Sequence, residues 1–179
     1  MVIGIPVGRS EKAASPATHA VEIAVWQALQ GVADPEIPVV SVIEMGMIGR
    51  VQIEDGAATV VVLPTFTGCP AIAVIQEDVR RALSQVDGIT SVQVETSFDP
   101  PWTTDRITDT GRDKLRGFGL APPDAAKVLI TEIGLPKVAK CPFCGSTDTR
   151  NDSPFGPTPC RASYYCSSCR NPFEQFKQV

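Results

Sequence analysis

Histidine and long apolar runs are almost missing from this sequence of 179 residues. His19 is the single histidine, so a histidine-rich metal site cannot be built within one chain. No apolar run approaches the roughly 20 residues that a membrane-spanning helix needs, and no membrane partner is expected. Residues 1–16 lack the basic segment and long apolar stretch of a signal peptide, so we expect a flexible leader on a cytoplasmic protein.

The short motifs that carry common catalytic chemistry are also missing. There is no Glu-x-x-His pair for a di-iron centre, no Gly-x-Gly-x-x-Gly turn for a dinucleotide and no Walker loop for a nucleoside triphosphate. These absences predict a protein that is not an enzyme and that supports chemistry performed by other proteins.

The net charge of −4 is unevenly distributed. From residue 137 onward there are six basic and three acidic residues, so the preceding body is acidic. An acidic body argues against nucleic acid as the main partner, although the basic C-terminal segment keeps a nucleic-acid-binding adaptor as an alternative. We interpret the aromatic residues of this segment as a small core rather than a base-stacking surface: Phe143, Phe155, Tyr164, Tyr165, Phe173 and Phe176.

Two Cys-x-x-Cys pairs are the strongest signal in the sequence. The first motif contains Cys141 and Cys144, and the second contains Cys166 and Cys169. Each short turn directs two sulfurs to one point. Four such sulfurs favour a structural zinc, with iron or an iron–sulfur cluster as the alternative metal and two disulfides as the non-metal alternative. Cys160 is a fifth candidate, which the spacing leaves as a free thiol, an alternative ligand or a redox partner.

The apolar pattern predicts an α/β (α+β) fold, in which a small two-helix, three-stranded mixed-sheet domain precedes a zinc-ribbon-like metal-binding tail. We expect helices at residues 16–33 and 72–86, strands at 48–53, 58–63 and 91–96, a short surface helix at 104–116 and a brief strand at 128–130. The expected organisation is a leader (1–16), an α/β domain (17–100), a helix with a linker (101–138) and the ribbon (139–179).

Cys69 lies apart from the other cysteines, between the second strand and the second helix. If Pro70 is the first helical residue, Cys69 is the N-cap, where free backbone N–H groups stabilise a thiolate. Thr65 and Thr67 then lie close enough to donate hydrogen bonds to sulfur or to an anion. Ligation of a metal or cluster, nucleophilic attack and a buried apolar thiol are the three interpretations. A single cysteine needs a dimer partner, a client protein or a small thiol to complete a cluster's ligands.

Several segments resemble a known family. Residues 34–38, 45–48 and 65–70 resemble the SufT-like iron–sulfur assembly domain, and this resemblance covers residues 17–99. Residues 101–105, 111–116 and 121–123, together with the terminal ribbon, resemble the PaaD family of accessory subunits of the bacterial phenylacetyl-CoA epoxidase system. One departure is Arg106, where the family usually has an aromatic residue, and it bears on a local packing or docking contact.

The resemblance implies a non-catalytic role in maturing the iron–sulfur or di-iron centres of the epoxidase. Cys69 would be the transfer or transient ligand, with Asp34 and Glu36 in a nearby loop, and the cargo would be a transient iron–sulfur cluster or iron. The implied partners are the epoxidase subunits, among them the iron–sulfur reductase component, and the iron–sulfur assembly machinery. A thiol–disulfide oxidoreductase that uses Cys69 with Cys160 is a further alternative.

Overall fold

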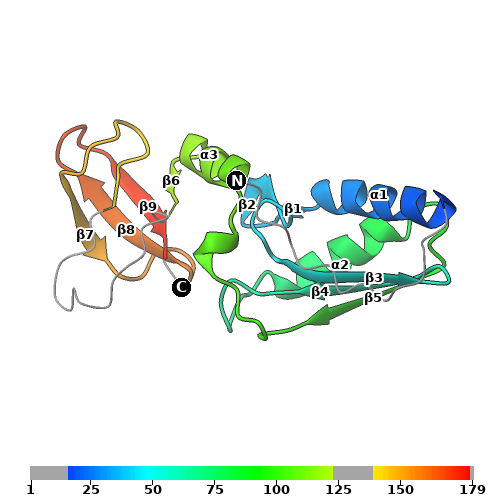
Figure 1. The fold of residues 1–179 in the computed structure, drawn as a ribbon. Coiled ribbons are helices and arrows are strands. Elements are labelled where there is room, and N and C mark those ends of the chain that lie inside the picture. Colours follow the sequence, from blue (N-terminus) through cyan, green and yellow to red (C-terminus); the bar gives the residue numbers. More distant parts are fainter. Residues whose placement is uncertain (1–15, 123–138, 178–179) are drawn as a thin grey trace.

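The computed structural model describes residues 16–122 and 139–177. Its first part is a three-stranded sheet of β3 (Ile48–Glu54), β4 (Ala57–Val62) and β5 (Ser91–Thr96), in that spatial order. β3 pairs with β4 in antiparallel and β4 with β5 in parallel orientation, so the sheet is mixed. Helices α1 (Pro16–Gln30) and α2 (Ile72–Leu83) lie on one face of the sheet (Figure 1). The predicted fold class is confirmed.

Local sequence explains this sheet. Asp55 and Gly56 both have positive φ, 50° and 83°, which is the backbone of the tight turn that matches the twist of a two-stranded hairpin. Because β4 and β5 are parallel, the chain must cross from one end of the sheet to the other, and α2 makes this crossing. The helix buries Ile75, Val79 and Leu83 against the sheet, at helical spacing.

A short ladder follows α1 before the main sheet begins. β1 (Ala33–Asp34) pairs with β2 (Ile37–Ser41), and the turn after β2 leads to the fully buried side chains of Met45 and Met47. The indole Nε1 of Trp102 donates a hydrogen bond of 2.8 Å to the carbonyl oxygen of Met45. This bond fixes the later segment of the chain against the first domain.

That later segment is divided into two helical pieces. The predicted helix at 104–116 is a short 3-10 turn, η1 (Thr104–Arg106), followed by α3 (Asp109–Gly117), and the side chain of Thr108 caps α3 by accepting from the N–H of Gly111. Arg106 donates to the carbonyl oxygens of Gly46 and Ile48 at 2.8 and 3.0 Å. Arg106, which stands where the family usually has an aromatic residue, therefore makes a local packing contact.

The C-terminal sheet has the spatial order β6-β9-β8-β7. Its strands are β6 (Leu120–Ala121), β7 (Thr149–Ser153), β8 (Arg161–Cys166) and β9 (Pro172–Phe176). β7, β8 and β9 form an antiparallel ribbon, and β6, from the expected linker, adds to it in parallel with β9. The expected strand at 128–130 lies outside the described residues.

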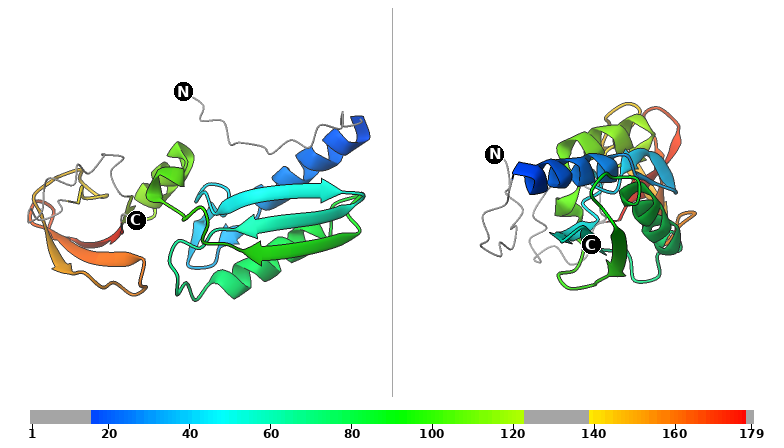
Figure 2. Two further views of the ribbon diagram at one scale, coloured as in Figure 1. Left: turned by 60° about the horizontal axis from the view of Figure 1, so that its bottom comes forward. Right: turned by 90° about the vertical axis from the view of Figure 1, so that its right-hand side faces the viewer.

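One apolar core continues across the junction between the two sheets. Trp102 and Phe176 pack with ring centroids 5.6 Å apart, and Phe176 and Cys160 from the ribbon belong to the same buried cluster as the core of the α/β domain. Two views agree that β8 and β9 approach the end of the α/β domain at which the loop between β4 and α2 lies (Figures 1 and 2). Over residues 16–122 and 139–177, no helix is long and apolar enough to cross a membrane.

Candidate functional site

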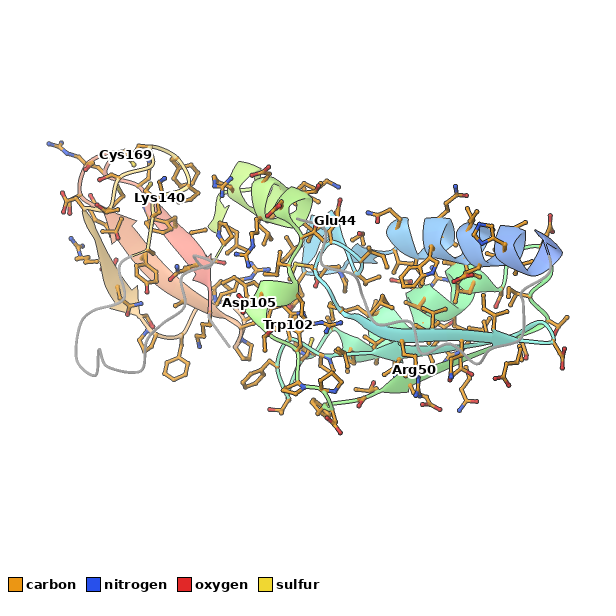
Figure 3. The ribbon with its side chains drawn as sticks, viewed as in Figure 1. Glu44, Arg50, Trp102, Asp105, Lys140 and Cys169 are labelled. Carbon is orange, nitrogen blue, oxygen red and sulfur yellow. The ribbon has the colours of Figure 1, made fainter. Side chains whose placement is uncertain are left out.

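The four paired cysteines form a compact sulfur cluster in the ribbon. The Sγ atoms of Cys141, Cys144, Cys166 and Cys169 all lie within 4.8 Å of one another. Two of the separations, Cys141 to Cys169 and Cys144 to Cys166, are 3.6 Å. Figure 3 shows Cys169 at the outer end of the ribbon, well away from Trp102 at the junction.

The two cysteine turns have matching backbones. Gly145, four residues after Cys141, has φ of 74°, and Arg170, four residues after Cys166, has φ of 59°. Each turn thus ends in the left-handed region, where glycine is favoured and Arg170 is a strained exception. The backbone N–H of Gly145 donates to the carbonyl oxygen of Cys141 at 2.9 Å and closes the first turn. Two similar turns therefore present two thiols each from opposite sides.

This donor set fits zinc. A tetrahedral site with zinc–sulfur bonds of about 2.3 Å places neighbouring sulfurs about 3.8 Å apart, close to the two separations of 3.6 Å. Its four sulfur donors fill the four positions of a tetrahedral site, so the cluster suits a closed structural site rather than a catalytic one with an open position. Cys141, Cys144, Cys166 and Cys169 would hold the ion, and the ion would supply folding free energy to the ribbon.

Cys160 does not belong to this cluster. It lies directly before β8, at the opposite end of that strand from Cys166, and it is buried in the core shared with the α/β domain. Its Sγ is 3.1 Å from the hydroxyl oxygen of Thr158. The sulfurs that the structure gathers are therefore the two symmetrical pairs, and Cys160 faces a different environment.

Cys69 lies in the loop between β4 and α2, at the end of the sheet that faces the ribbon (Figure 1). The expectation that Cys69 is the helix N-cap is wrong, because α2 begins at Ile72 and its N-cap is Ala71. Pro70 lies in a preceding turn in which the N–H of Ile72 bonds to the carbonyl oxygen of Cys69 at 3.4 Å. Cys69 is half-buried and packs against the main core.

The electrostatic expectation for Cys69 is wrong as well. Burial raises the pKa of the Cys69 thiol, and the negative charges of Glu36, Asp34 and Cys160 raise it further, against the opposing effect of the Ala71 N–H. Without a bound cation, the thiol is therefore protonated at neutral pH. A metal ion would reverse this preference, because thiols bind metal as thiolates.

Two carboxylates from the β1–β2 turn act on this thiol. Asp34 is buried, and its Oδ1 accepts from the N–H groups of Glu36 and Ile37 at 2.7 and 3.1 Å. Burial raises the pKa of Asp34 despite these bonds. Burial and the charge of Asp34 also raise the pKa of Glu36, which is half-buried. The predicted acidic residues are thus brought near Cys69 by the fold.

The other residues singled out from the sequence have different environments. Thr65 is buried and Thr67 is exposed, on the same loop as Cys69. Tyr164, Phe173 and Phe176 are buried in the ribbon, as a small core requires, whereas Phe143 and Phe155 are exposed.

Arg161 is the residue at this site that sequence reasoning missed. It is buried, and its Nη2 donates a hydrogen bond of 3.0 Å to the carbonyl oxygen of Glu36. Its Nη1 forms an ion pair of 3.0 Å with Glu174. Arg161 looks like an ordinary basic residue in a basic segment, and only the docking of the ribbon reveals its place beside Cys160, Asp34 and Glu36.

Comparison with known proteins defines the class of both parts. Residues 22–96 match the family described as iron–sulfur cluster assembly protein, and residues 125–177 match the PaaD zinc beta ribbon domain. A crystal structure of the DUF59 domain of unknown function from Bacillus anthracis has the same fold as the first part. Its TM-score is 0.51 at 26% identity, over 54% of this chain and 92% of that one. The protein is an iron–sulfur assembly domain joined to a zinc ribbon.

Two relatives narrow the class to a family. A protein from Escherichia coli, provisionally named as a 1,2-phenylacetyl-CoA epoxidase subunit, is 38% identical over 87% of this chain and 92% of its own length. A protein from Porphyromonas gingivalis named Fe-S protein maturation auxiliary factor is 39% identical over 45% of this chain and 77% of its own length. The chain belongs to the PaaD family.

Proposed function

We propose that this protein is a maturation factor for the metal centres of a phenylacetyl-CoA epoxidase. In this proposal Cys69 is the ligand through which iron or an iron–sulfur cluster is held transiently and passed to a client protein. The observation that carries the proposal is the position of Cys69. It is the one partly exposed thiol outside the four-sulfur cluster, on a loop of the domain that matches iron–sulfur assembly proteins.

The ribbon has a supporting role in this proposal. Cys141, Cys144, Cys166 and Cys169 hold a structural zinc, which shapes a second domain over residues 139–179. Residues 17–100 form the assembly domain, and residues 101–138 join the two and contribute β6 to the ribbon sheet. The exposed rings of Phe143 and Phe155 give the ribbon apolar surface for docking to epoxidase subunits.

The same proposal makes the protein an accessory factor without catalytic turnover of its own. All six cysteines are free thiols, which suits a reducing compartment such as the cytoplasm. The raised pKa of Cys69 disfavours the thiol–disulfide oxidoreductase alternative, because the attacking species in that reaction is the thiolate. The buried aromatic residues of the ribbon disfavour a base-stacking surface.

Deletion of the gene tests the proposal. A strain that lacks the protein should produce an epoxidase with low iron content and low activity, and the wild-type chain should restore both. A Cys69→Ser variant should fail to restore them, whereas Ala73→Ser, an exposed change four residues away, should restore them fully. A fully metallated, fully active epoxidase in the deletion strain would show that the proposed function is wrong.

A further inference from the structure

Cys160 has no role in the zinc cluster, yet it is held in a fixed position beside the assembly domain. Its carbonyl oxygen accepts a hydrogen bond of 2.8 Å from the N–H of Lys177, and its Sγ lies 3.1 Å from the hydroxyl of Thr158. The side chain is 8% exposed and belongs to the buried cluster against which Cys69 packs. The ribbon therefore delivers one thiol to the neighbourhood of the other.

Arg161 holds the segment around Cys160 against the assembly domain. Because it follows Cys160 directly, its hydrogen bond to the carbonyl oxygen of Glu36 draws the start of β8 onto the β1–β2 turn. The same turn carries the two carboxylates whose charges act on Cys69. Two views agree that the start of β8 and the β4–α2 loop lie side by side (Figures 1 and 2). Thus two thiols, two carboxylates and one guanidinium from distant parts of the chain lie in one neighbourhood at the junction.

The guanidinium has an unused donor. Arg161 is 9% exposed, and its buried Nε has no hydrogen-bond partner among residues 16–122 and 139–177. A buried donor without a partner costs about 1 to 3 kcal/mol, and a water, an ion or another bound group can supply the missing acceptor. The positive charge of Arg161 also acts on Cys160 and favours its thiolate, which is the form that binds metal.

We propose that Cys160 is the second protein ligand for the cargo held at Cys69. The two sulfurs form a bis-thiolate site for an iron ion, alone or as part of a cluster, assembled across the junction of the two domains. The inference rests on the proposed function and extends it. Half-buried Cys69 faces the client, while buried Cys160 anchors the cargo.

The number of donors leaves this site open. In the part of the chain that the structure describes, the zinc-type cluster is the one place where three or more ligand groups converge. The proposed site at Cys69 and Cys160 therefore has no third protein ligand, and two tetrahedral positions are free. A client thiol can take a free position and then replace Cys69. Each exchange breaks one iron–sulfur bond to the chain and forms one to the client. The proton that the client thiol loses goes to the released cysteine, and no electron moves.

Cobalt provides a test that does not depend on epoxidase activity. Chain whose ribbon is filled with one zinc is titrated anaerobically with Co²⁺ in thiol-free buffer, and the sulfur-to-cobalt charge-transfer absorption is measured. The intensity of this band grows with the number of thiolate ligands. We expect Cys69→Ser and Cys160→Ser each to lower it to about half or less, and the double variant to abolish it. Ser163→Ala, on strand β8 three residues after Cys160, should leave the band unchanged.

X-ray absorption at the cobalt edge of the wild-type protein gives a second measurement that needs no variant. With zinc content constant at one per chain, the cobalt signal reports the new site alone. Two sulfur ligands support the proposal. One sulfur ligand, or a Cys160→Ser band equal to that of wild type, overturns it while leaving Cys69 as the transfer ligand. Absence of cobalt binding overturns the bis-thiolate site. The proposed function itself is overturned by the separate result that the deletion strain makes a normal epoxidase.

Discussion

Arg161 reaches from the ribbon to Glu36 in the assembly domain, with Nη2 donating a hydrogen bond of 3.0 Å to the backbone carbonyl oxygen. Its Nη1 makes the ion pair with Glu174 at 3.0 Å, so one guanidinium joins a strand of the ribbon to the loop of the candidate site. Since the Arg161 side chain is buried and its bond to Glu36 is partly buried, loss of the guanidinium leaves the Glu36 carbonyl and the Glu174 carboxylate without these partners.

Replacement of Arg161 should therefore loosen the junction. We expect Arg161→Met to lower the free energy of unfolding by about 2 to 3 kcal/mol, because it removes two charge-assisted bonds and leaves the carbonyl of Glu36 unpaired. Urea and thermal unfolding measure the change. Arg116→Met is the control, since its ion pair with Asp113 is exposed and should change stability by less than about 0.5 kcal/mol. Equal effects of the two variants would contradict the role of Arg161.

Removal of the ribbon metal should change the environment of Trp102 at the junction between the two sheets. Elemental analysis should find one zinc per chain, lost in Cys166→Ser and retained in Cys69→Ser. Because Phe176 of the ribbon covers Trp102, unfolding of the ribbon should expose this indole and shift its fluorescence to the red. A Trp26→Phe background isolates the signal, since the chain has two tryptophans. Zinc that follows Cys69 instead would refute the assignment to the ribbon.

The sheet and the cysteine pairs could be predicted because their signals are local. Strand alternation and the turn at Asp55 and Gly56 specify the hairpin within a few residues, and β5 begins and ends where the sequence predicts. The spacing of the Cys-x-x-Cys pairs likewise identifies the four sulfurs that converge in the ribbon.

The surroundings of Cys69 could not be predicted, because they depend on contacts between distant segments. Cys160 lies in another domain, and no local pattern indicates that β8 docks beside the β4–α2 loop. The expected low pKa of Cys69 rested on a helix N-cap, but the turn at Pro70 delays the helix to Ile72, and burial then raises the pKa. The first error is local, because a turn precedes the helix, and the second arises because burial in the tertiary structure overrode the electrostatic rule.

The carboxylate of Glu36 should slow the reaction of Cys69 with alkylating reagents. Burial first, and then the charges of Glu36 and Asp34, raise the pKa of this thiol, so little thiolate is present at pH 8. In the zinc-loaded protein, Glu36→Gln should lower that pKa and speed alkylation of Cys69 by iodoacetamide about two- to fivefold. Mass spectrometry of the labelled peptide follows the rate. Glu54→Gln, the same charge change at the exposed hairpin end, should have no effect. Equal rates in both variants would mean that Glu36 does not act on the thiol.

The ionised carboxylate of Asp34 should lower the free energy of unfolding at neutral pH. Burial raises its pKa above the ordinary 3.8, so the folded state binds the proton more tightly than the unfolded state does. The stabilisation that comes from the protonated form is complete below pH 3.8 and is lost as the pH rises through the folded-state pKa. In Asp34→Asn, the amide oxygen can still accept from the N–H groups of Glu36 and Ile37.

We therefore expect Asp34→Asn to be more stable than wild type at pH 7, by about 1 kcal/mol, and to lose this advantage toward pH 4. Urea unfolding at several pH values measures the difference. Asp34→Ala serves as the contrast, because it removes the acceptor and leaves the buried N–H of Ile37 unpaired, which should destabilise the fold at every pH. An advantage of Asp34→Asn at neutral pH combined with weaker metal binding would show that the charge is kept for the thiol site. If the stability difference between Asp34→Asn and wild type were less favourable to the variant at pH 7 than at pH 4, this result would contradict the raised pKa of Asp34.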